Sequence, residues 1–263
     1  MKQNKVILCG MAASAPKIFK DEESGEFKLG VLTLNVVRNN RPTGDTDRQL
    51  RQYTIFIKTD KPELIAKMDK IGQFDQVFVK GTLVTKAKDK TSICPECQTE
   101  QTQTGVIVYI YPIFIDILEQ NLTRKESADL LYERREISND ISIIGHLCSD
   151  PMKVEALKNT PIAQYQIGVG RKFKVDEDKT DFPWVKSYGT NAKDDLLRLR
   201  TGSGVLIDGY LQTRAIEKKC RCATCGSVYT WNDYAMEIVP YETEYLKDYT
   251  TDDELAMMQN AIN

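Results

Sequence analysis

The sequence has very little histidine and no long apolar segment. His146 is the one histidine among 263 residues, so catalysis that needs several imidazoles is excluded. No segment approaches the roughly 18 to 20 continuous apolar residues of a membrane-spanning helix. The apolar run before Gly10 is too short for a convincing secretion signal. We therefore expect a globular, cytoplasmic protein without a membrane segment, whose cysteines are kept reduced.

The chain also lacks a marked excess of charge of either sign. Its formal net charge is −2, from 36 Lys and Arg against 38 Asp and Glu, which at first counts against a nucleic-acid partner. Residues 248–263, however, carry four acidic residues and no basic one, so residues 1–247 carry +2. The sequence therefore predicts a mildly basic body followed by an acidic tail. Such a tail is either a solvated terminus or a segment with a function.

A repeat with a period above one hundred residues organises the chain. The segment GTLVTK begins at Gly81 and GYLQTR begins at Gly209, which is 128 residues later. The same offset relates three further pairs, namely Cys94 with Cys222, Cys97 with Cys225, and Pro112 with Pro240. A match of this kind without gaps indicates a tandem duplication. Upstream the offset drifts, as loops of different length require: 135 for Gly10 and Gly145, 133 for Arg38 and Arg171, and 131 for Tyr53 and Trp184.

Each copy has the pattern of five strands with one short helix. In the first copy the segments rich in β-branched and aromatic residues are 5–10, 30–37, 52–58, 76–86 and 106–118. A helix is expected over residues 61–71, with Pro62 near its first turn and Gly72 after its end, and the second copy repeats it over 192–200. This order is that of an OB-fold, a small Greek-key barrel, although another five-stranded barrel or an open sheet has the same pattern.

The duplication predicts an all-β protein with short helices, built from two tandem OB-folds and divided into four parts. The first OB-fold covers residues 1–118 and the second covers residues 139–247. Residues 119–138 between them contain no Gly or Pro and many charged helix formers, which predicts a helical linker. Residues 248–263 form the acidic tail.

Each copy resembles the single-stranded DNA-binding (SSB) proteins of bacteria and phages. The resemblance rests on an aromatic-led third strand, a short helix and a hairpin in which a charged residue precedes glycine. These features are Arg51-Gln-Tyr-Thr-Ile-Phe-Ile with Val77-Phe-Val-Lys-Gly-Thr-Leu-Val-Thr-Lys, and Phe182-Pro-Trp-Val-Lys-Ser-Tyr with Val205-Leu-Ile-Asp-Gly-Tyr-Leu-Gln-Thr-Arg. The family implies sequence-tolerant, non-catalytic binding of single strands in replication, recombination or DNA transfer, with a phage or mobile element as one possible origin. It also implies four OB-folds per assembly, and therefore a homodimer.

The resemblance and the strand pattern together select the candidate stacking residues. Stacking on exposed bases tolerates any sequence, because every base has a π-face. The stacking Trp of the family falls on Trp184 and, in the first copy, on Tyr53. Strand alternation places Trp184, Lys186 and Tyr188 on one face, which favours a binding surface over core packing. The other aromatic candidates are Phe56 and Phe173.

Basic residues recur at matched places in the two copies, where they are expected to contact phosphates. Taken singly, each is more simply a solvated surface charge. The candidates are Arg38, Arg41, Lys80 and Lys86 in the first copy, and Arg171, Lys172 and Arg214 in the second.

Two CxxC pairs, Cys94 with Cys97 and Cys222 with Cys225, lie between the fourth and fifth strands of their copies. Each has the spacing of a zinc knuckle but offers two thiolates, whereas structural zinc takes four ligands. Three arrangements would supply more ligands. The two CxxC pairs could share one zinc ion, or each pair could bind zinc together with the same pair of another subunit. Alternatively, Cys220 could add a third thiolate to the pair of the second copy, with another group completing the site. We expect the shared structural zinc, because the duplication matches these four cysteines alone. A redox CxxC or free thiols are the alternatives.

Other functions remain open at this point. An RNA-binding protein or a primosome-type adaptor would use the same fold, and no residue decides how the 2′-hydroxyl is read. A zinc-dependent nuclease or deaminase is disfavoured, since no H-x-E…C-x-x-C signature is present. The SSB family ends in an acidic, then hydrophobic, tip that recruits replication and recombination proteins. Here the ending from Asp252 is only loosely similar, so recruitment by the tail is an expectation.

Overall fold

The computed structural model describes residues 2–38, 51–154, 160–175 and 178–262 of the chain. The same order of strands and helices occurs twice, with one additional strand, β10, in the second copy. The first copy contains β1 (Asn4–Ala12), β2 (Lys17–Lys20), β3 (Phe27–Val37), β4 (Gln52–Thr59), α1 (Pro62–Met68), β5 (Gln76–Ile93) and β6 (Glu100–Glu119). The second contains β7 (Asn139–Leu147), β8 (Met152–Val154), β9 (Ile162–Val175), β10 (Asp178–Asp181), β11 (Trp184–Tyr188), α3 (Gly189–Arg198), β12 (Gly204–Arg221) and β13 (Val228–Lys247).

The pairings close each copy into an OB-fold barrel. In the first copy β1 pairs with β3, β3 with β4, β4 in parallel with β6, β6 with β5, and β5 with β1. In the second copy β7, β9, β11, β13 and β12 make the same circuit. The prediction of an all-β protein with two tandem OB-folds is confirmed.

Alternation of buried and exposed residues explains why these strands form barrels. In β4, Ile55 and Ile57 are fully buried while Phe56 between them is 41% exposed, as expected for a strand with one face toward the core. One hydrophobic cluster contains core residues of both barrels, from Leu32 in the first to Ile238 in the second. The two copies therefore share one hydrophobic core.

Helix α1 closes the end of the first barrel. Pro62 is at its start, where the missing N–H costs no hydrogen bond, and Ile65 and Met68 are buried. Gly30 lies beneath this helix, because a Cβ there would lie 3.0 Å from the Met68 sulfur and 3.2 Å from Ile65. Helix α1 can therefore pack this closely on β3 because Gly30 has no side chain.

Helix α2 (Arg124–Glu133) lies in the segment expected to link the two copies, and a 3₁₀ turn (Arg135–Ile137) follows it. A capping box starts α2. The Thr123 hydroxyl accepts from the Glu126 backbone N–H, and the Glu126 carboxylate accepts from the Thr123 N–H at 2.8 Å. Such a box satisfies two N–H groups that a helix start leaves unpaired. The linker is therefore an ordered element.

Antiparallel pairing of β1 with β7 joins the two barrels into one sheet. Val6 lies opposite Ile141 and Lys5 lies opposite Ser142. Each strand keeps its pairing within its own barrel on the other edge, β1 with β5 and β7 with β12. The two copies are related by a local two-fold axis at this junction.

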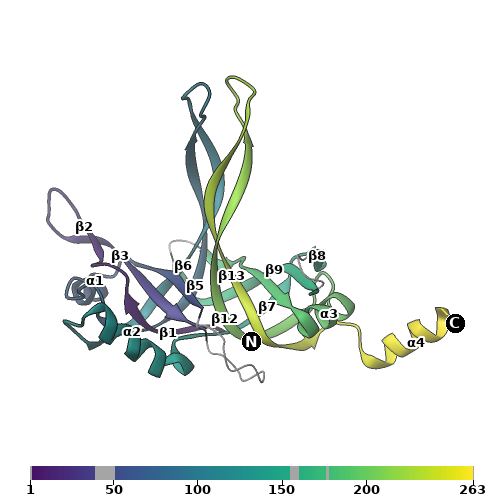
Figure 1. The fold of residues 1–263 in the computed structure, drawn as a ribbon. Helices are drawn as coiled ribbons and strands as arrows, with labels where there is room; N and C mark the ends of the chain where they lie inside the picture. Colours follow the sequence, from purple (N-terminus) through teal and green to yellow (C-terminus); the bar gives the residue numbers. More distant parts are fainter. Residues whose placement is uncertain (1, 39–50, 155–159, 176–177, 263) are drawn as a thin grey trace.

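Two long hairpins, β5–β6 and β12–β13, extend from the barrels and lie alongside each other (Figure 1). Asp233 connects them, since Lys90 donates to its two oxygens at 2.7 and 2.8 Å and Lys218 lies 2.7 Å away. Nearer the tips, the hydroxyls of Ser92 and Tyr229 are 2.8 Å apart. These contacts bring the two CxxC loops together.

The C-terminal helix α4 (Asp252–Ile262) extends away from the barrels (Figure 1). Its start is fixed to α3, because Arg198 contacts Asp252 at 2.5 Å and the Thr250 N–H donates to the Arg198 carbonyl at 2.9 Å. Residues 252–262 of the predicted acidic tail thus form a helix with three carboxylates in its first turn. No helix in the described part of the chain combines the length and apolar character needed to span a membrane.

Candidate cysteine cluster and nucleic-acid interface

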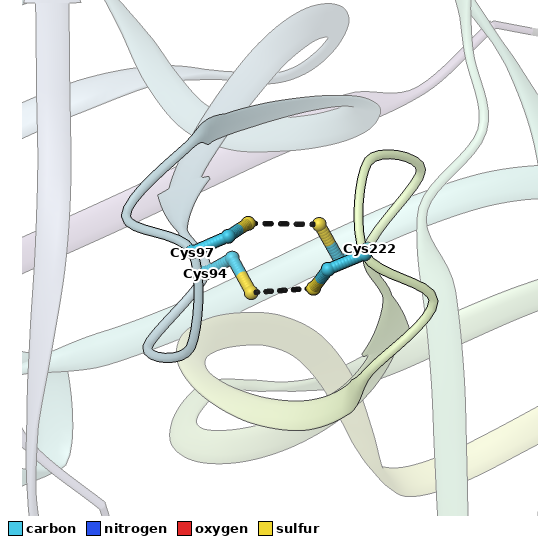
Figure 2. Close-up of side chains that lie close together, drawn as sticks. Cys94, Cys97 and Cys222 are labelled. Atoms are coloured by element: carbon cyan, nitrogen blue, oxygen red, sulfur yellow. Dashed lines mark hydrogen bonds between the residues drawn. The ribbon is translucent and has the colours of Figure 1, made fainter.

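The four matched cysteines meet at the hairpin tips. Their sulfurs all lie within 4.8 Å of one another. Cys94 Sγ lies 3.7 Å from Cys225 Sγ, and Cys97 Sγ lies 3.6 Å from Cys222 Sγ. Figure 2 shows Cys94 and Cys97 on one loop facing Cys222 on the other. The expected convergence of both pairs within one chain is observed, so no second subunit is needed to complete the set of four.

The two CxxC loops have the same backbone geometry. In the first, the Gln98 N–H donates to the Cys94 carbonyl at 2.9 Å, and in the second the Gly226 N–H donates to the Cys222 carbonyl at 3.0 Å. Gln98 and Gly226 both have a positive φ, of 57° and 75°. Gly adopts that conformation at little cost, whereas Gln98 is strained. Each loop thereby turns both of its sulfurs toward the other loop.

The electrostatics favour a thiolate on one cysteine of each pair, Cys94 and Cys222, whereas burial and the neighbouring sulfurs of Cys222 and Cys225 raise the pKa of Cys97. Backbone N–H groups of Cys225 and Thr224 donate to the Cys222 sulfur and lower its pKa to about 5. The Ser227 hydroxyl and the Cys97 backbone N–H lower the pKa of Cys94. Thiolates are the form of cysteine that binds metal.

The spacing of the sulfurs fits a tetrahedral metal ion. Zn–S bonds of about 2.3 Å in a tetrahedron place sulfurs roughly 3.8 Å apart, close to the two distances above. Cys220 is buried beside the cluster and lies opposite Tyr229 in the hairpin. It does not belong to the four-sulfur group, which argues against the predicted alternative of a three-thiolate site.

The outer face of β11 presents the expected aromatic and basic residues. Trp184 and Lys186 are half-buried, Tyr188 is 36% exposed, and Val185 and Ser187 between them are fully buried. Burial lowers the pKa of Lys186, and the nearby carboxylate of Glu237 opposes this shift. The predicted alternation is therefore observed, with Trp184, Lys186 and Tyr188 on one face.

The pairing registers identify Phe56, not Tyr53, as the counterpart of Trp184. Ile57 lies opposite Ile110, and Val185 lies opposite Ile238. Both pairs are 128 residues apart, so the downstream offset already applies within this strand. The offset of 131 that matched Tyr53 to Trp184 is therefore wrong. The change in loop length lies entirely before β4.

Tyr53 itself faces the core and is 7% exposed. Its ring stacks on Tyr210 of the second barrel with centroids 5.8 Å apart, and burial raises its pKa to about 12. Tyr53 thus packs between the barrels, and this burial contradicts the interpretation of Tyr53 as a base-stacking residue.

Lys58 completes the matched face on the first barrel and was missed from the sequence. It is 128 residues before Lys186, and its Nζ lies 5.3 Å from the centre of the Tyr109 ring. The signal was available, because Phe56-Ile-Lys58 matches Trp184-Val-Lys186 once the correct offset is used. Both barrels therefore present an aromatic residue and a lysine two residues apart on one face.

Arg171 is buried in an ion pair rather than exposed to phosphates. It is 1% exposed, and its Nε lies 2.7 Å from Asp181 Oδ2. Asp181, fully buried, also accepts at 2.8 Å from the backbone N–H of Thr85 in the first barrel. This placement contradicts the prediction of a phosphate contact at Arg171, and it makes the pair a link between the barrels.

Removing one member of this pair is expected to destabilise the whole chain. Arg171→Ala would leave Asp181 buried without its cation, a change that costs about 3–5 kcal/mol. The neighbouring exposed Lys172→Ala is the matched control, expected within about 0.5 kcal/mol of the parent. Urea unfolding followed by circular dichroism measures both, and equal stability of the two variants would contradict the assignment.

The remaining candidates lie in different environments. Arg38 donates to the Tyr210 hydroxyl at 3.2 Å, and Phe173 lies against Tyr111 with ring centres 6.1 Å apart, so both contribute to the contact between barrels. Arg214 is held by Glu237 through two hydrogen bonds of 3.0 and 2.8 Å. Lys172 and Lys86 are exposed, Lys80 lies on the outer face of the central sheet, and Arg41 lies outside the described residues.

Part of the sequence matches a known protein family and a protein of known function. Residues 138–224 match the model of the single-strand binding protein family. A single-stranded DNA-binding protein of Aquifex aeolicus (strain VF5) is 31% identical over 85 residues, which cover 31% of this chain and 58% of that protein. The family match thus lies on the second copy, and the 85 aligned residues span somewhat more than half of the Aquifex relative.

Solved structures resemble the chain over nearly its full length. The wild-type single-stranded DNA-binding protein of Thermus aquaticus matches with a TM-score of 0.58 and 19% identity, over 94% of this chain and 95% of that one. A deletion mutant of the same protein matches at 0.58 and 20%, over 95% and 97%. The whole two-barrel fold is therefore similar to that of these proteins.

Proposed function

We propose that this chain binds single-stranded DNA without sequence preference and protects it during replication, recombination or DNA transfer. The observation that carries the proposal is the repeated aromatic–lysine face. Phe56 with Lys58 and Trp184 with Lys186 occupy equivalent positions on two closed OB-fold barrels. Exposed aromatic rings stack with unpaired bases, and nearby lysines neutralise phosphates. Binding of this kind requires no catalytic residue.

Several of the predicted residues complete the proposed binding surface. Tyr188 extends the second face, and its hydroxyl accepts a hydrogen bond of 3.2 Å from Gln212. The exposed residues Lys172 and Lys86 are proposed phosphate contacts. Arg214 is a third proposed phosphate contact, and its guanidinium also donates to Glu237. Arg38, Tyr53, Phe173 and Arg171 instead hold the barrels in place.

A titration with three nucleic acids tests the function directly. The intrinsic tryptophan fluorescence of the parent chain is expected to fall on addition of oligo(dT), because Trp184 stacks on a base. Duplex DNA of equal length is expected to bind at least about tenfold more weakly, since its bases are already stacked. Affinity for oligo(dT) is expected to decrease as salt increases, through counterion release.

The same titration contains the outcomes that would contradict the proposal. Tighter binding of oligo(rU) would favour the RNA-binding alternative. Absence of binding to both single strands would favour a protein adaptor of the primosome type. An affinity that does not change with salt would contradict the proposed phosphate contacts.

We also propose that the four-cysteine cluster holds one structural zinc ion per chain. The donors would be the sulfurs of Cys94, Cys97, Cys222 and Cys225. The spacing of the four sulfurs and the lowered pKa of Cys94 and Cys222 support this set. The ion would fasten the two hairpin tips together, and it has no role in contacting DNA in this proposal.

Three further expectations belong to the proposed function. The chain contains two OB-folds, so an assembly with four of them would be a homodimer. We also expect the protein to act in the cytoplasm. Helix α4, with three acidic residues in its first turn and Met257 69% exposed, is the segment proposed to contact replication or recombination proteins.

A further inference from the structure

Glu237 places a carboxylate on the outer face of the second barrel, beside Lys186. Ile238 of β13 pairs in parallel with Val185 of β11, and both side chains are fully buried. Neighbouring residues of a strand point to opposite faces, so Glu237 and Lys186 both point to the outer face. Burial lowers the pKa of Lys186, and the charge of Glu237 opposes this shift. A negative charge therefore lies among the residues that are proposed to bind single-stranded DNA.

Both oxygens of Glu237 are engaged by Arg214 of β12. Glu237 Oε2 accepts from Arg214 Nε at 3.0 Å, and Glu237 Oε1 accepts from Arg214 Nη2 at 2.8 Å. Although it points to the outer face, the Glu237 side chain is 3% exposed, whereas 38% of the Arg214 side chain is exposed. The hydrogen bonds to Glu237 also raise the pKa of Arg214. The carboxylate thus lies beneath a guanidinium group that solvent reaches in part.

This pairing weakens the contact that Arg214 can make with a phosphate. Arginine binds phosphate most strongly through a fork of parallel N–H groups, the geometry that also binds a carboxylate. Glu237 takes the fork formed by Nε and Nη2. Its negative charge also repels a phosphate held at Arg214 or Lys186, and burial reduces the screening of that charge by water and salt. Two cations with one carboxylate leave a single net positive charge on this face.

The first copy has an uncharged residue at the position of Glu237. Tyr109 lies 128 residues before Glu237, and the centre of its ring is 5.3 Å from Nζ of Lys58, the lysine equivalent to Lys186. Asp60, the carboxylate that follows this strand, is exposed, so water screens its charge. The barrel therefore forms without a buried carboxylate at this position, and the charge of Glu237 is not a requirement of the fold.

We propose that Glu237 limits the affinity of the second barrel for the phosphates of single-stranded DNA by holding Arg214. Glu237 acts through the arginine and is a positioning residue, with no contact to DNA of its own. The second face then binds a strand mainly by stacking on Trp184 and Tyr188. The inference rests on the proposed function, and it predicts that removing one charge makes binding tighter.

Glu237→Gln tests this role, because it removes the charge and keeps a side chain of nearly the same size. Oligo(dT) is expected to bind the variant about fivefold or more tightly at low salt. The slope of log affinity against log salt concentration is expected to steepen by about 0.7, the value for one added phosphate contact on a single strand. Quenching of tryptophan fluorescence across a salt series measures both. Glu133→Gln on α2 removes an exposed carboxylate outside the proposed faces, and this control is expected to show neither change.

Variants of Arg214 test whether the gain passes through the arginine. Adding Arg214→Gln to Glu237→Gln is expected to remove both the gain in affinity and the additional slope. In the parent chain, Arg214→Gln alone is expected to flatten the slope by clearly less than about 0.7, because the paired arginine neutralises a phosphate only in part. That measurement needs no change at Glu237, so it tests the inference even if Glu237→Gln does not fold.

Three results would overturn the inference. They are unchanged or weaker binding by a Glu237→Gln chain that circular dichroism shows to be folded, a gain that survives the loss of Arg214, and a full flattening of about 0.7 on Arg214→Gln in the parent chain. If the parent chain did not bind oligo(dT), the proposed function itself would be contradicted. Intact binding by the parent chain with no effect of Glu237→Gln would remove this inference alone.

Discussion

The purified chain is expected to contain one zinc ion per molecule, and Cys222→Ser is expected to lose it. Four thiolates at tetrahedral spacing bind zinc with roughly 10–16 kcal/mol of apparent free energy at neutral pH, so removal requires a strong chelator or loss of a ligand. Elemental analysis gives the stoichiometry. Cys148→Ser removes an exposed cysteine outside the cluster and is expected to keep the metal.

Loss of the ion is expected to loosen the hairpin tips and leave the barrels folded. The cysteine cluster forms a small packing unit with Tyr229 and Trp231, separate from the main core. Limited proteolysis should therefore cut within the hairpins of the Cys222→Ser variant well before the barrels. The shared zinc site would be contradicted by two zinc ions per chain. It would also be contradicted if the chain contained no zinc and the four cysteines of the cluster reacted as free thiols. Unfolding of the barrels on chelation would show that the ion stabilises more than the tips.

The second large effect is expected when both stacking faces are removed together. Each base–aromatic stack contributes about 1–3 kcal/mol. Phe56→Ala combined with Trp184→Ala is therefore expected to weaken oligo(dT) binding by about 2–6 kcal/mol if the two sites are independent, which is ~30-fold or more. Fluorescence anisotropy of labelled oligo(dT) measures the change, because the double variant lacks Trp184.

Controls separate stacking from folding in that experiment. Tyr132→Ala removes an aromatic residue of α2 that is 55% exposed and lies outside the proposed faces, so affinity should not change. Tyr53→Leu is expected to lower stability through the loss of its stack on Tyr210. If Tyr53→Leu reduced affinity more than Phe56→Ala while keeping full stability, the assignment of the faces would be reversed.

The duplication allowed the two-barrel fold to be predicted from a single sequence. Gly81 and Gly209 lie at equivalent bulges where β5 and β12 turn toward their hairpins, and a Cβ on either would lie within 2.5 Å of a backbone oxygen. Because neither position has room for a side chain, both copies carry glycine there. These two glycines revealed the 128-residue offset between the copies. Convergence of the two CxxC loops followed from that offset combined with the tetrahedral requirement of zinc.

The errors came from treating charge and aromatic character as signs of exposure. Tyr53 and Arg171 belong to residue types that are usually at the surface or at a binding face. Each is buried by contacts with the other barrel, since Tyr210 covers Tyr53 and Thr85 shares Asp181 with Arg171. Contacts between residues more than ninety positions apart leave no local pattern. Strand alternation did carry one unused signal, because Phe56 lies between two isoleucines that must face the core.

The junction of β1 with β7 has a consequence for dividing this protein into halves. Each of the two strands lies in the interior of the continuous sheet, and a cut near residue 138 would leave β1 or β7 with an open row of N–H and C=O groups. An exposed strand edge of that kind pairs readily with any other chain and promotes aggregation. Each half therefore depends on the other to cover the edge of its first strand, β1 or β7. Neither half has the covered sheet edge of an independent domain.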